Sequence, residues 1–149
     1  MSNSIFLRNL GTITFVIPTL NCKEELLERL CQIKQDFPYA TYIVVDDLSK
    51  DGTWYYAKQR GCFVPYTFKK RGYGKSLIEG LCLAWFSLES DYVVQMDVDH
   101  TADIKRFLEF MKEHDLDLLV GWEKSASSKF REYARRFACW LTRTFLGLK

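Results

Sequence analysis

The stretch Asp91-Tyr92-Val93-Val94-Gln95-Met96-Asp97-Val98-Asp99 decides the fold, because it predicts a buried strand that ends in two carboxylates. Side chains two residues apart point to the same side of an extended backbone, so Asp97 and Asp99 are expected to converge on one point. Two neighbouring carboxylates repel each other, and a hard cation such as Mg²⁺ or Mn²⁺ removes that repulsion. The stretch therefore predicts a metal site; the alternative is a solvated loop in which Asp99 or Thr101 caps the next helix.

Strand and helix patterns alternate on both sides of this stretch. Apolar, β-branched runs predict strands at residues 13–17, which Pro18 stops, and at 42–45, 62–64 and 116–120. Helical spacing predicts helices from Asn21, as a cap, to Phe37, and at 53–57, 74–88 and 104–111. This alternation predicts an α/β fold with three layers, α/β/α, around a mostly parallel central sheet.

Two carboxylate-rich loops and one basic loop are expected at the same edge of that sheet. Asp46 and Asp47 directly follow the strand at 42–45, as Asp97 and Asp99 follow the later strand. The basic segment Lys69-Lys70-Arg71-Gly72-Tyr73-Gly74-Lys75-Ser76 opens a helix, where free backbone N–H groups bind anions. Ligands of such sheets bind beyond the carboxyl ends of the strands. The combination predicts a nucleotide diphosphate compound bound through a metal.

Length and composition limit the other classes of function. A chain of 149 residues is expected to form one domain over residues 1–149. The net charge of +2 gives no support to nucleic-acid binding. Five widely spaced cysteines predict reduced thiols, and the chain shows neither a signal-peptide pattern nor an apolar run of membrane-spanning length. We expect a cytoplasmic protein, either free or attached peripherally to the cytoplasmic face of a membrane.

Five stretches in order resemble the motifs of family 2 glycosyltransferases with the GT-A (Rossmann-like) fold. They lie at residues 16–21, 43–53, 70–74, 94–99 and 117–121. The resemblance is closest to the dolichyl-phosphate mannosyltransferase and polyprenyl-phosphate glycosyltransferase branch. It implies metal-dependent, inverting transfer of a hexose, mannose or glucose in type, from a GDP- or UDP-sugar to a polyprenyl or dolichyl phosphate.

The resemblance also implies roles for individual residues. Pro18 and Asp46 would line the pocket for base and ribose, with Thr19 and Asp47 in the same donor-binding set. Lys70 would lie near the donor phosphates, while Asp97 and Asp99 would hold Mg²⁺ or Mn²⁺ against the diphosphate. The alternatives are a turn-capping carboxylate for Asp46 and a solvated surface lysine for Lys70.

The segment 124–149 predicts a basic amphipathic helix, with an apolar stripe over residues 129–146. By the resemblance, Arg131 and Arg136 of this helix would face the phosphates of donor and acceptor, with Arg135 as a near competitor. Such a helix can also lie on an anionic membrane surface. The alternative is a helix that packs its apolar stripe on the sheet.

The chain departs from the family at several positions. The family commonly has glycine at Leu48, glutamate at Cys22, arginine at Glu123 and asparagine at Cys139, and it continues beyond Lys149 into a segment on the acceptor side. Either a second subunit or a second copy of the chain completes the acceptor site, or the domain is a minimal form, or it binds nucleotide sugar without efficient transfer. The alternatives are a non-catalytic, regulatory nucleotide-sugar-binding domain and a transferase with a glycan hydroxyl acceptor. The sequence shows no convincing general base, which favours an acceptor that is already anionic.

Overall fold

The computed structural model describes residues 11–99 and 103–120 of the chain. They belong to two units, residues 1–100 and 101–149, and we describe each unit by itself. The first unit holds a sheet with helices on both faces. In the second, the described residues form one helix, α5 (Ile104–Glu113), whose N-cap Asp103 accepts a hydrogen bond from the backbone N–H of Arg106. The expectation of a single domain over residues 1–149 stays a prediction.

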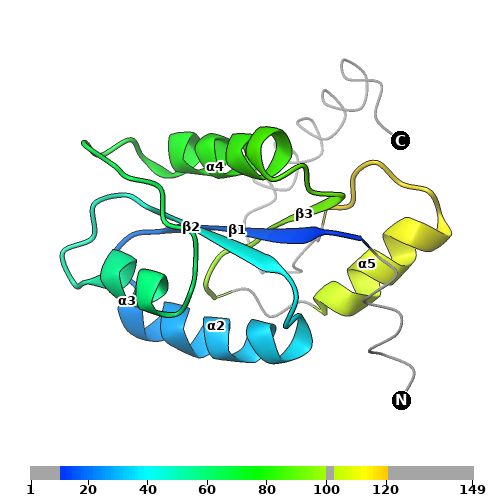
Figure 1. Cartoon of the computed structure of the whole chain (residues 1–149), viewed down its shortest axis with the longest axis horizontal. Coiled ribbons are helices and arrows are strands. Elements are labelled where there is room, and N and C mark those ends of the chain that lie inside the picture. The colour runs from blue at the N-terminus through cyan, green and yellow to red at the C-terminus, as the bar shows by residue number, and fades with distance from the viewer. Residues whose placement is uncertain (1–10, 100–102, 121–149) are drawn as a thin grey trace, which may run out of the picture. The chain divides into compact units, whose positions relative to one another are not determined.

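Three parallel strands form the sheet, in the order β2-β1-β3 (Figure 1). They are β1 (Ile13–Thr19), β2 (Thr41–Asp46) and β3 (Tyr92–Gln95), and Val16 of β1 pairs with Ile43 on one side and Gln95 on the other. Every residue of β1 is buried, as a central strand with helices on both faces requires. The predicted parallel sheet is confirmed.

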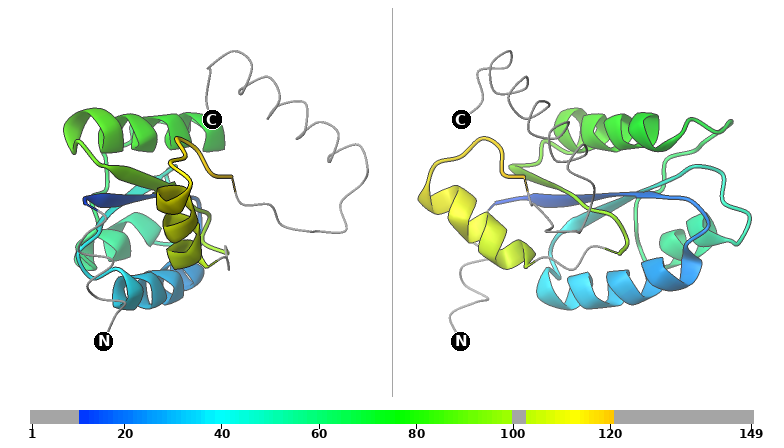
Figure 2. Two further views of the ribbon diagram at one scale, coloured as in Figure 1. Left: turned by 90° about the vertical axis from the view of Figure 1, so that its right-hand side faces the viewer. Right: turned by 180° about the vertical axis from the view of Figure 1, so that it is seen from behind.

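Helices cover both faces of this sheet, which confirms the three-layer arrangement (Figures 1 and 2). Two helices, α2 (Lys23–Asp36) and α3 (Thr53–Gln59), lie on one face. On the other lies α4 (Tyr73–Cys82), which continues directly into a π-helical turn, η1 (Leu83–Ser87). None of the helices in the described ranges is both long enough and apolar enough to cross a membrane.

Close packing on both faces fixes the layers. Under α4, the fully buried side chains of Val16 and Val45 leave no room beside Gly80, where a Cβ atom would lie 2.4 Å from Cγ1 of Val16. On the α2 face, the Phe15 ring stacks on Tyr42 and tilts against Phe37, with centroids 5.2 Å apart in each pair. These contacts hold the strand ends, and therefore the loops that follow them, in fixed positions.

The predicted end of the first strand at Pro18 is wrong, because β1 continues to Thr19. Residues of a strand offer their N–H groups alternately to the two neighbours, and Val16 accepts from Met96 on the β3 side. Pro18 therefore faces that same side, where β3 has already ended at Gln95. The missing N–H costs no ladder hydrogen bond, which is the condition under which proline is tolerated in a sheet.

Asn21 does not cap α2, contrary to the prediction. The N-cap is Cys22, and Asn21 adopts a left-handed backbone with φ of 50°. In this conformation its side chain turns to the loop after β2 and accepts from the N–H of Lys50 at 2.8 Å.

The outer strands predicted from apolar runs are reduced or absent. The run at 62–64 forms a single parallel bridge between Phe63 and Ile43, in agreement with the irregular strand that Pro65 predicts. Residues 116–120 form no strand, so that prediction is wrong. Asp115 is left-handed, and the N–H of Leu116 bonds back to the carbonyl of Met111 at 3.1 Å, so these residues continue the turn after α5.

Candidate functional site

The carboxylate of Asp46 organises the loop that follows β2. Its Oδ2 accepts from the N–H of Ser49 at 2.9 Å, and its Oδ1 accepts from the hydroxyls of Ser49 at 2.5 Å and Thr19 at 3.4 Å. Only 4% of Asp46 is exposed, so these bonds replace lost solvent contacts. The structure thus brings Asp46 and Thr19 together and shows the turn-capping role for Asp46. Contact of either residue with a nucleotide stays a prediction, as it does for the buried Pro18.

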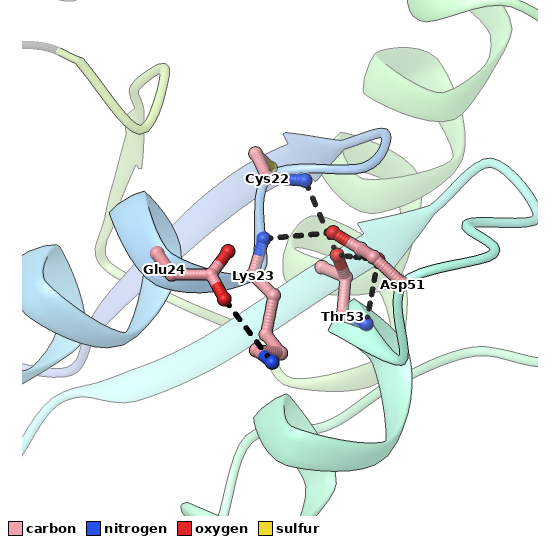
Figure 3. A network of polar contacts seen from close by, with 5 residues as sticks. All are labelled: Cys22, Lys23, Glu24, Asp51 and Thr53. Carbon is pink, nitrogen blue, oxygen red and sulfur yellow. Dashed lines mark hydrogen bonds and ion pairs between the residues drawn. The ribbon is translucent and has the colours of Figure 1, made fainter.

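A second carboxylate, Asp51, joins the same loop to the start of α2. It accepts from the backbone N–H groups of Lys23 and Thr53, both at 3.0 Å, and from the Thr53 hydroxyl at 2.6 Å (Figure 3). The Thr53 hydroxyl in turn accepts from the N–H of Cys22 at 3.3 Å. Partial burial acts to raise the pKa of Asp51, but the hydrogen bonds from Thr53 and Lys23 outweigh it and hold that pKa below its ordinary value.

The loop after β2 contains a left-handed leucine. Leu48 has φ of 63°, a conformation that costs a β-carbon-bearing residue about 1–2 kcal/mol. Asn21, in the loop after β1, also has a left-handed backbone, and it donates its N–H to the Ser49 hydroxyl at 2.8 Å. The conformation explains physically why a glycine suits the position of Leu48.

The third carboxylate of this region, Asp47, holds the basic segment in place. Its Oδ1 accepts from the N–H of Arg71 at 2.7 Å, and its Oδ2 accepts from the N–H of Gly72 at 3.0 Å. Gly72 has φ of 80°, and Asp47 is 6% exposed. Lys70, directly before these anchored residues, is exposed. Sequence reasoning missed this clamp, because 24 residues separate Asp47 from Arg71.

Buried polar atoms without partners lie where the basic segment enters α4. The Arg71 guanidinium contacts the Thr67 hydroxyl at 2.7 Å and Oε2 of Glu79 at 2.5 Å, but its Nε has no hydrogen-bond partner among the residues that the structure describes. The hydroxyl of Ser76, which is 1% exposed, also has none. Buried polar groups of this kind are costly unless another polar group or water reaches them.

The side chain of Tyr73 connects the same basic segment to the residues at the end of β3. Its hydroxyl donates to Oδ1 of Asp97 at 2.9 Å and accepts from Nε2 of Gln95 at 3.0 Å. Partial burial and the hydrogen bond to Asp97 raise the pKa of Tyr73 to about 12. Residues 71–73 therefore connect Asp47, after β2, with Asp97, after β3. The tyrosine was missed as a site residue because nothing in its sequence neighbourhood identifies its partner.

Asp97 and Asp99 follow β3, as predicted, but they do not extend it as a strand, and β3 is only partly buried, contrary to the prediction of a buried strand. β3 ends at Gln95, and Val98 and Asp99 form a turn that Arg29 of α2 fixes by donating its Nε–H to the Val98 carbonyl at 3.1 Å. Both aspartates are exposed. Nowhere in residues 11–99 or 103–120 do three or more His, Cys, Asp or Glu side chains gather as a metal site. Two exposed carboxylates fit a hard cation only if water or ligand phosphate oxygens complete its coordination.

The remaining predicted site residues, Arg131 and Arg136, and the helix predicted at 124–149 lie outside the described residues.

The fold and the polar edge define an α/β domain of the GT-A kind, with carboxylates and a basic segment at the carboxyl ends of parallel strands. The family model for glycosyl transferase family 2 matches residues 14–147, so the chain belongs to that family. No curated protein matched the chain in a sequence comparison.

Two structures of TarS support the same fold, and a third solved structure is more distantly similar. Residues 1–349 of S. aureus TarS are 27% identical to this chain, with a TM-score of 0.61, over 79% of this chain and 37% of that one. A structure of TarS 1–349 in complex with UDP is 24% identical, with a TM-score of 0.56, over 79% of this chain and 38% of that one. The mannosyltransferase PcManGT from Pyrobaculum calidifontis, in complex with GDP-Man and Mn²⁺, is 18% identical, with a TM-score of 0.43, over 53% of this chain and 31% of that one. The chain spans little more than a third of the TarS structures.

Proposed function

We propose that this chain binds a GDP- or UDP-sugar and acts in transfer of its hexose, of mannose or glucose type, to a polyprenyl or dolichyl phosphate. The observation that carries the proposal is the link across the sheet edge, where residues 71–73 join Asp47 to Asp97. This link places a basic segment beside carboxylates at the carboxyl ends of two parallel strands, where α/β folds bind nucleotides. Membership of family 2 and the UDP bound by the structurally similar TarS support the same donor class.

In this proposal, the ends of β1 and β2 bind the nucleoside of the donor, and the end of β3 binds the metal at its diphosphate. Pro18, Thr19 and Asp46 receive the nucleoside, and Asp46 also caps the loop beside them. Lys70, which is exposed, is the cationic group proposed to meet the diphosphate, next to Arg71 in the basic segment. Asp47 acts through the backbone, since it positions the basic segment that carries both groups.

Asp97 and Asp99 are the residues that would hold Mg²⁺ or Mn²⁺. Oδ1 of Asp97 is oriented by Tyr73, and its Oδ2 accepts no hydrogen bond from the described part of the chain. When bound, such a cation would neutralise the charge of the departing diphosphate.

The proposed reaction is displacement at the anomeric carbon. An oxygen of the acceptor phosphate forms the new bond as the bond to the donor diphosphate breaks, so the configuration inverts and the nucleoside diphosphate leaves. A phosphate monoester is largely ionised near neutral pH, because its second pKa lies near ~6, so no side chain has to remove a proton. A phosphate acceptor is therefore favoured over a sugar hydroxyl, and Arg131 and Arg136 are the residues proposed to face it.

Calorimetric titration of the chain with GDP- and UDP-sugars, with and without Mn²⁺, tests donor binding. We expect binding that requires the metal and is lost in Asp97→Ala. Absence of binding to every sugar nucleotide in the presence of Mn²⁺ would overturn the proposal.

Transfer of radiolabelled sugar separates the acceptors. Dolichyl phosphate, undecaprenyl phosphate and oligosaccharides are offered in parallel, and label in a polyprenyl phosphate product is expected. Label only in the oligosaccharide would assign a hydroxyl acceptor instead.

A further inference from the structure

We propose that the segment 66–75 and the outer side of α4 and η1 form a docking surface for an anionic lipid bilayer. The inference concerns a surface and not the transfer reaction, although it rests on the proposed function in one respect: it gives the polyprenyl acceptor a route to the site. Donor binding and bilayer binding are measured separately, so either can fail alone.

The segment Tyr66-Thr67-Phe68-Lys69-Lys70-Arg71-Gly72-Tyr73-Gly74-Lys75 contains three aromatic and four basic side chains and no acidic one. At its tip, Tyr66 is 77% and Phe68 is 87% exposed. Their rings pack edge to face with centroids 4.6 Å apart, so they form one small apolar projection. Highly exposed aromatic rings are typical of side chains that insert at the boundary of a bilayer.

Positive charge surrounds this projection. Lys69, Lys70 and Lys75 are exposed, and no carboxylate of the described residues forms an ion pair with them. Arg71 differs, because Glu79 pairs with it at 2.5 Å. Three uncompensated lysines next to an apolar tip match the charge of anionic headgroups and favour electrostatic attraction to them.

The outer side of α4 and η1 extends this surface with apolar side chains. Ile78 is 61%, Trp85 is 64% and Phe86 is 77% exposed, while Gly80 and Ala84 of the same helices are buried on the sheet. Figure 1 and the right-hand view of Figure 2 show the segment between α3 and α4 reaching its tip at the level of α4, on the same side of the sheet. The basic, aromatic segment thus leads into the helix that carries the exposed apolar side chains, on the same side of the sheet.

The aliphatic part of the surface decides between possible partners. Single-stranded nucleic acid would use the lysines and the aromatic rings, but it offers nothing apolar to cover Ile78, Leu81 and Leu88, which are 61%, 36% and 41% exposed. A bilayer interface accommodates aliphatic side chains, tryptophan, tyrosine and lysine together. Tyr73 belongs to the same segment and bonds to Asp97, so a bilayer held here lies beside the proposed site.

Co-sedimentation with lipid vesicles tests the surface. The full chain is mixed with vesicles of phosphatidylcholine alone or with 30% phosphatidylglycerol, a chosen composition of about the anionic content that polybasic surfaces respond to. We expect binding only to the anionic vesicles and weakening by at least about tenfold when salt is raised from 50 to 500 mM, in line with the screening of surface charges.

Variants locate the contact. Tyr66→Ser/Phe68→Ser and Trp85→Ser/Phe86→Ser should each weaken vesicle binding by about tenfold or more, since each removes two inserted rings. Tyr39→Ser, which alters a tyrosine 76% exposed between α2 and β2, is the matched control and should bind as the parent does. Thermal unfolding and Mn²⁺-dependent UDP binding show that each variant is folded.

Three results would overturn the inference. The first is equal binding of both double variants and the parent to anionic vesicles. The second is binding to single-stranded RNA without binding to vesicles, which would assign a nucleic-acid surface. The third is a dimer in sedimentation velocity that both double variants dissociate, with no vesicle binding, which would assign the face to a second copy of the chain.

Discussion

The carboxylates that follow β2 and those that follow β3 have opposite surroundings. Asp46 and Asp47 are buried and accept hydrogen bonds from their own loop and from the basic segment, whereas Asp97 and Asp99 are exposed on a turn. The first pair is committed to holding the backbone in place. The second pair keeps lone pairs available for the proposed metal, whereas the oxygens of the first pair hold the loops, including the loop at which we propose that the nucleoside binds. Tyr73 connects the two regions.

The largest effect on stability is expected from Asp47→Ala. The substitution removes the acceptor for the N–H groups of Arg71 and Gly72, and hydrogen bonds to a charged group contribute about 1.5–3 kcal/mol each. We expect the free energy of unfolding in urea to fall by about 3 kcal/mol. Asp99→Ala is the exposed control and should change it by less than about 0.5 kcal/mol. Equal losses in the two variants would break the comparison.

The largest effect on binding is expected at the other strand end. Asp97→Ala should weaken Mn²⁺-supported binding of UDP or GDP by at least about 100-fold, because it removes a proposed metal ligand. The midpoint of thermal unfolding should stay within about 2 °C of the parent, since an exposed carboxylate contributes little to stability. Titration calorimetry and differential scanning calorimetry check the two parts. Unchanged affinity would remove Asp97 from the site.

A smaller change in stability is expected at Leu48. Leu48→Gly relieves the left-handed conformation, worth about 1–2 kcal/mol, and loses about 0.5–1 kcal/mol to backbone entropy. The net expectation is a gain of about 0.5–1 kcal/mol in urea unfolding. Leu20→Gly is the matched control, because Leu20 is exposed nearby without a positive φ, and it should lose about 0.5–1 kcal/mol. A loss at both positions would show that no strain is stored in this loop.

The smallest expected effect is on the pH dependence of stability, through Asp51. The pKa of Asp51 lies below its ordinary value in the folded chain, so its contribution to stability is present above the unfolded pKa and is lost as pH falls through the folded pKa. The stability difference between parent and Asp51→Asn should therefore narrow between pH 6 and pH 3 in denaturant titrations. Thr53→Ala removes the hydroxyl that donates to Asp51. In that background, the stability difference caused by Asp51→Asn should already be smaller at pH 6. A difference that is constant with pH would show that Asp51 is not coupled to folding.

Much of the fold followed from local sequence patterns, and the site followed only in part. Alternating apolar strands and amphipathic helices predicted the parallel sheet, its two helical layers and the shared edge of Asp46 and Asp97. The patterns failed where a distant partner decides the structure. Pro18 stays in β1 only because β3 ends opposite Val16, and the turn at Val98 is fixed by Arg29 of α2. Likewise, the clamp of Asp47 on Arg71 depends on a contact that no local spacing encodes.

The wide turn η1 has a consequence for how β3 enters the sheet. The N–H of Leu88 bonds to the carbonyl of Leu83, five residues back, so this turn carries one residue more than an α-helical turn would. Two residues further on, Ser90 and Asp91 bond to Thr14 and Thr12 of the neighbouring chain segment. The extra residue in the turn therefore determines which side chains after the helix lie opposite Thr12 and Thr14. If the turn tightened to an α-helical turn with every residue retained, Glu89 would take the place of Ser90 beside the buried Thr14.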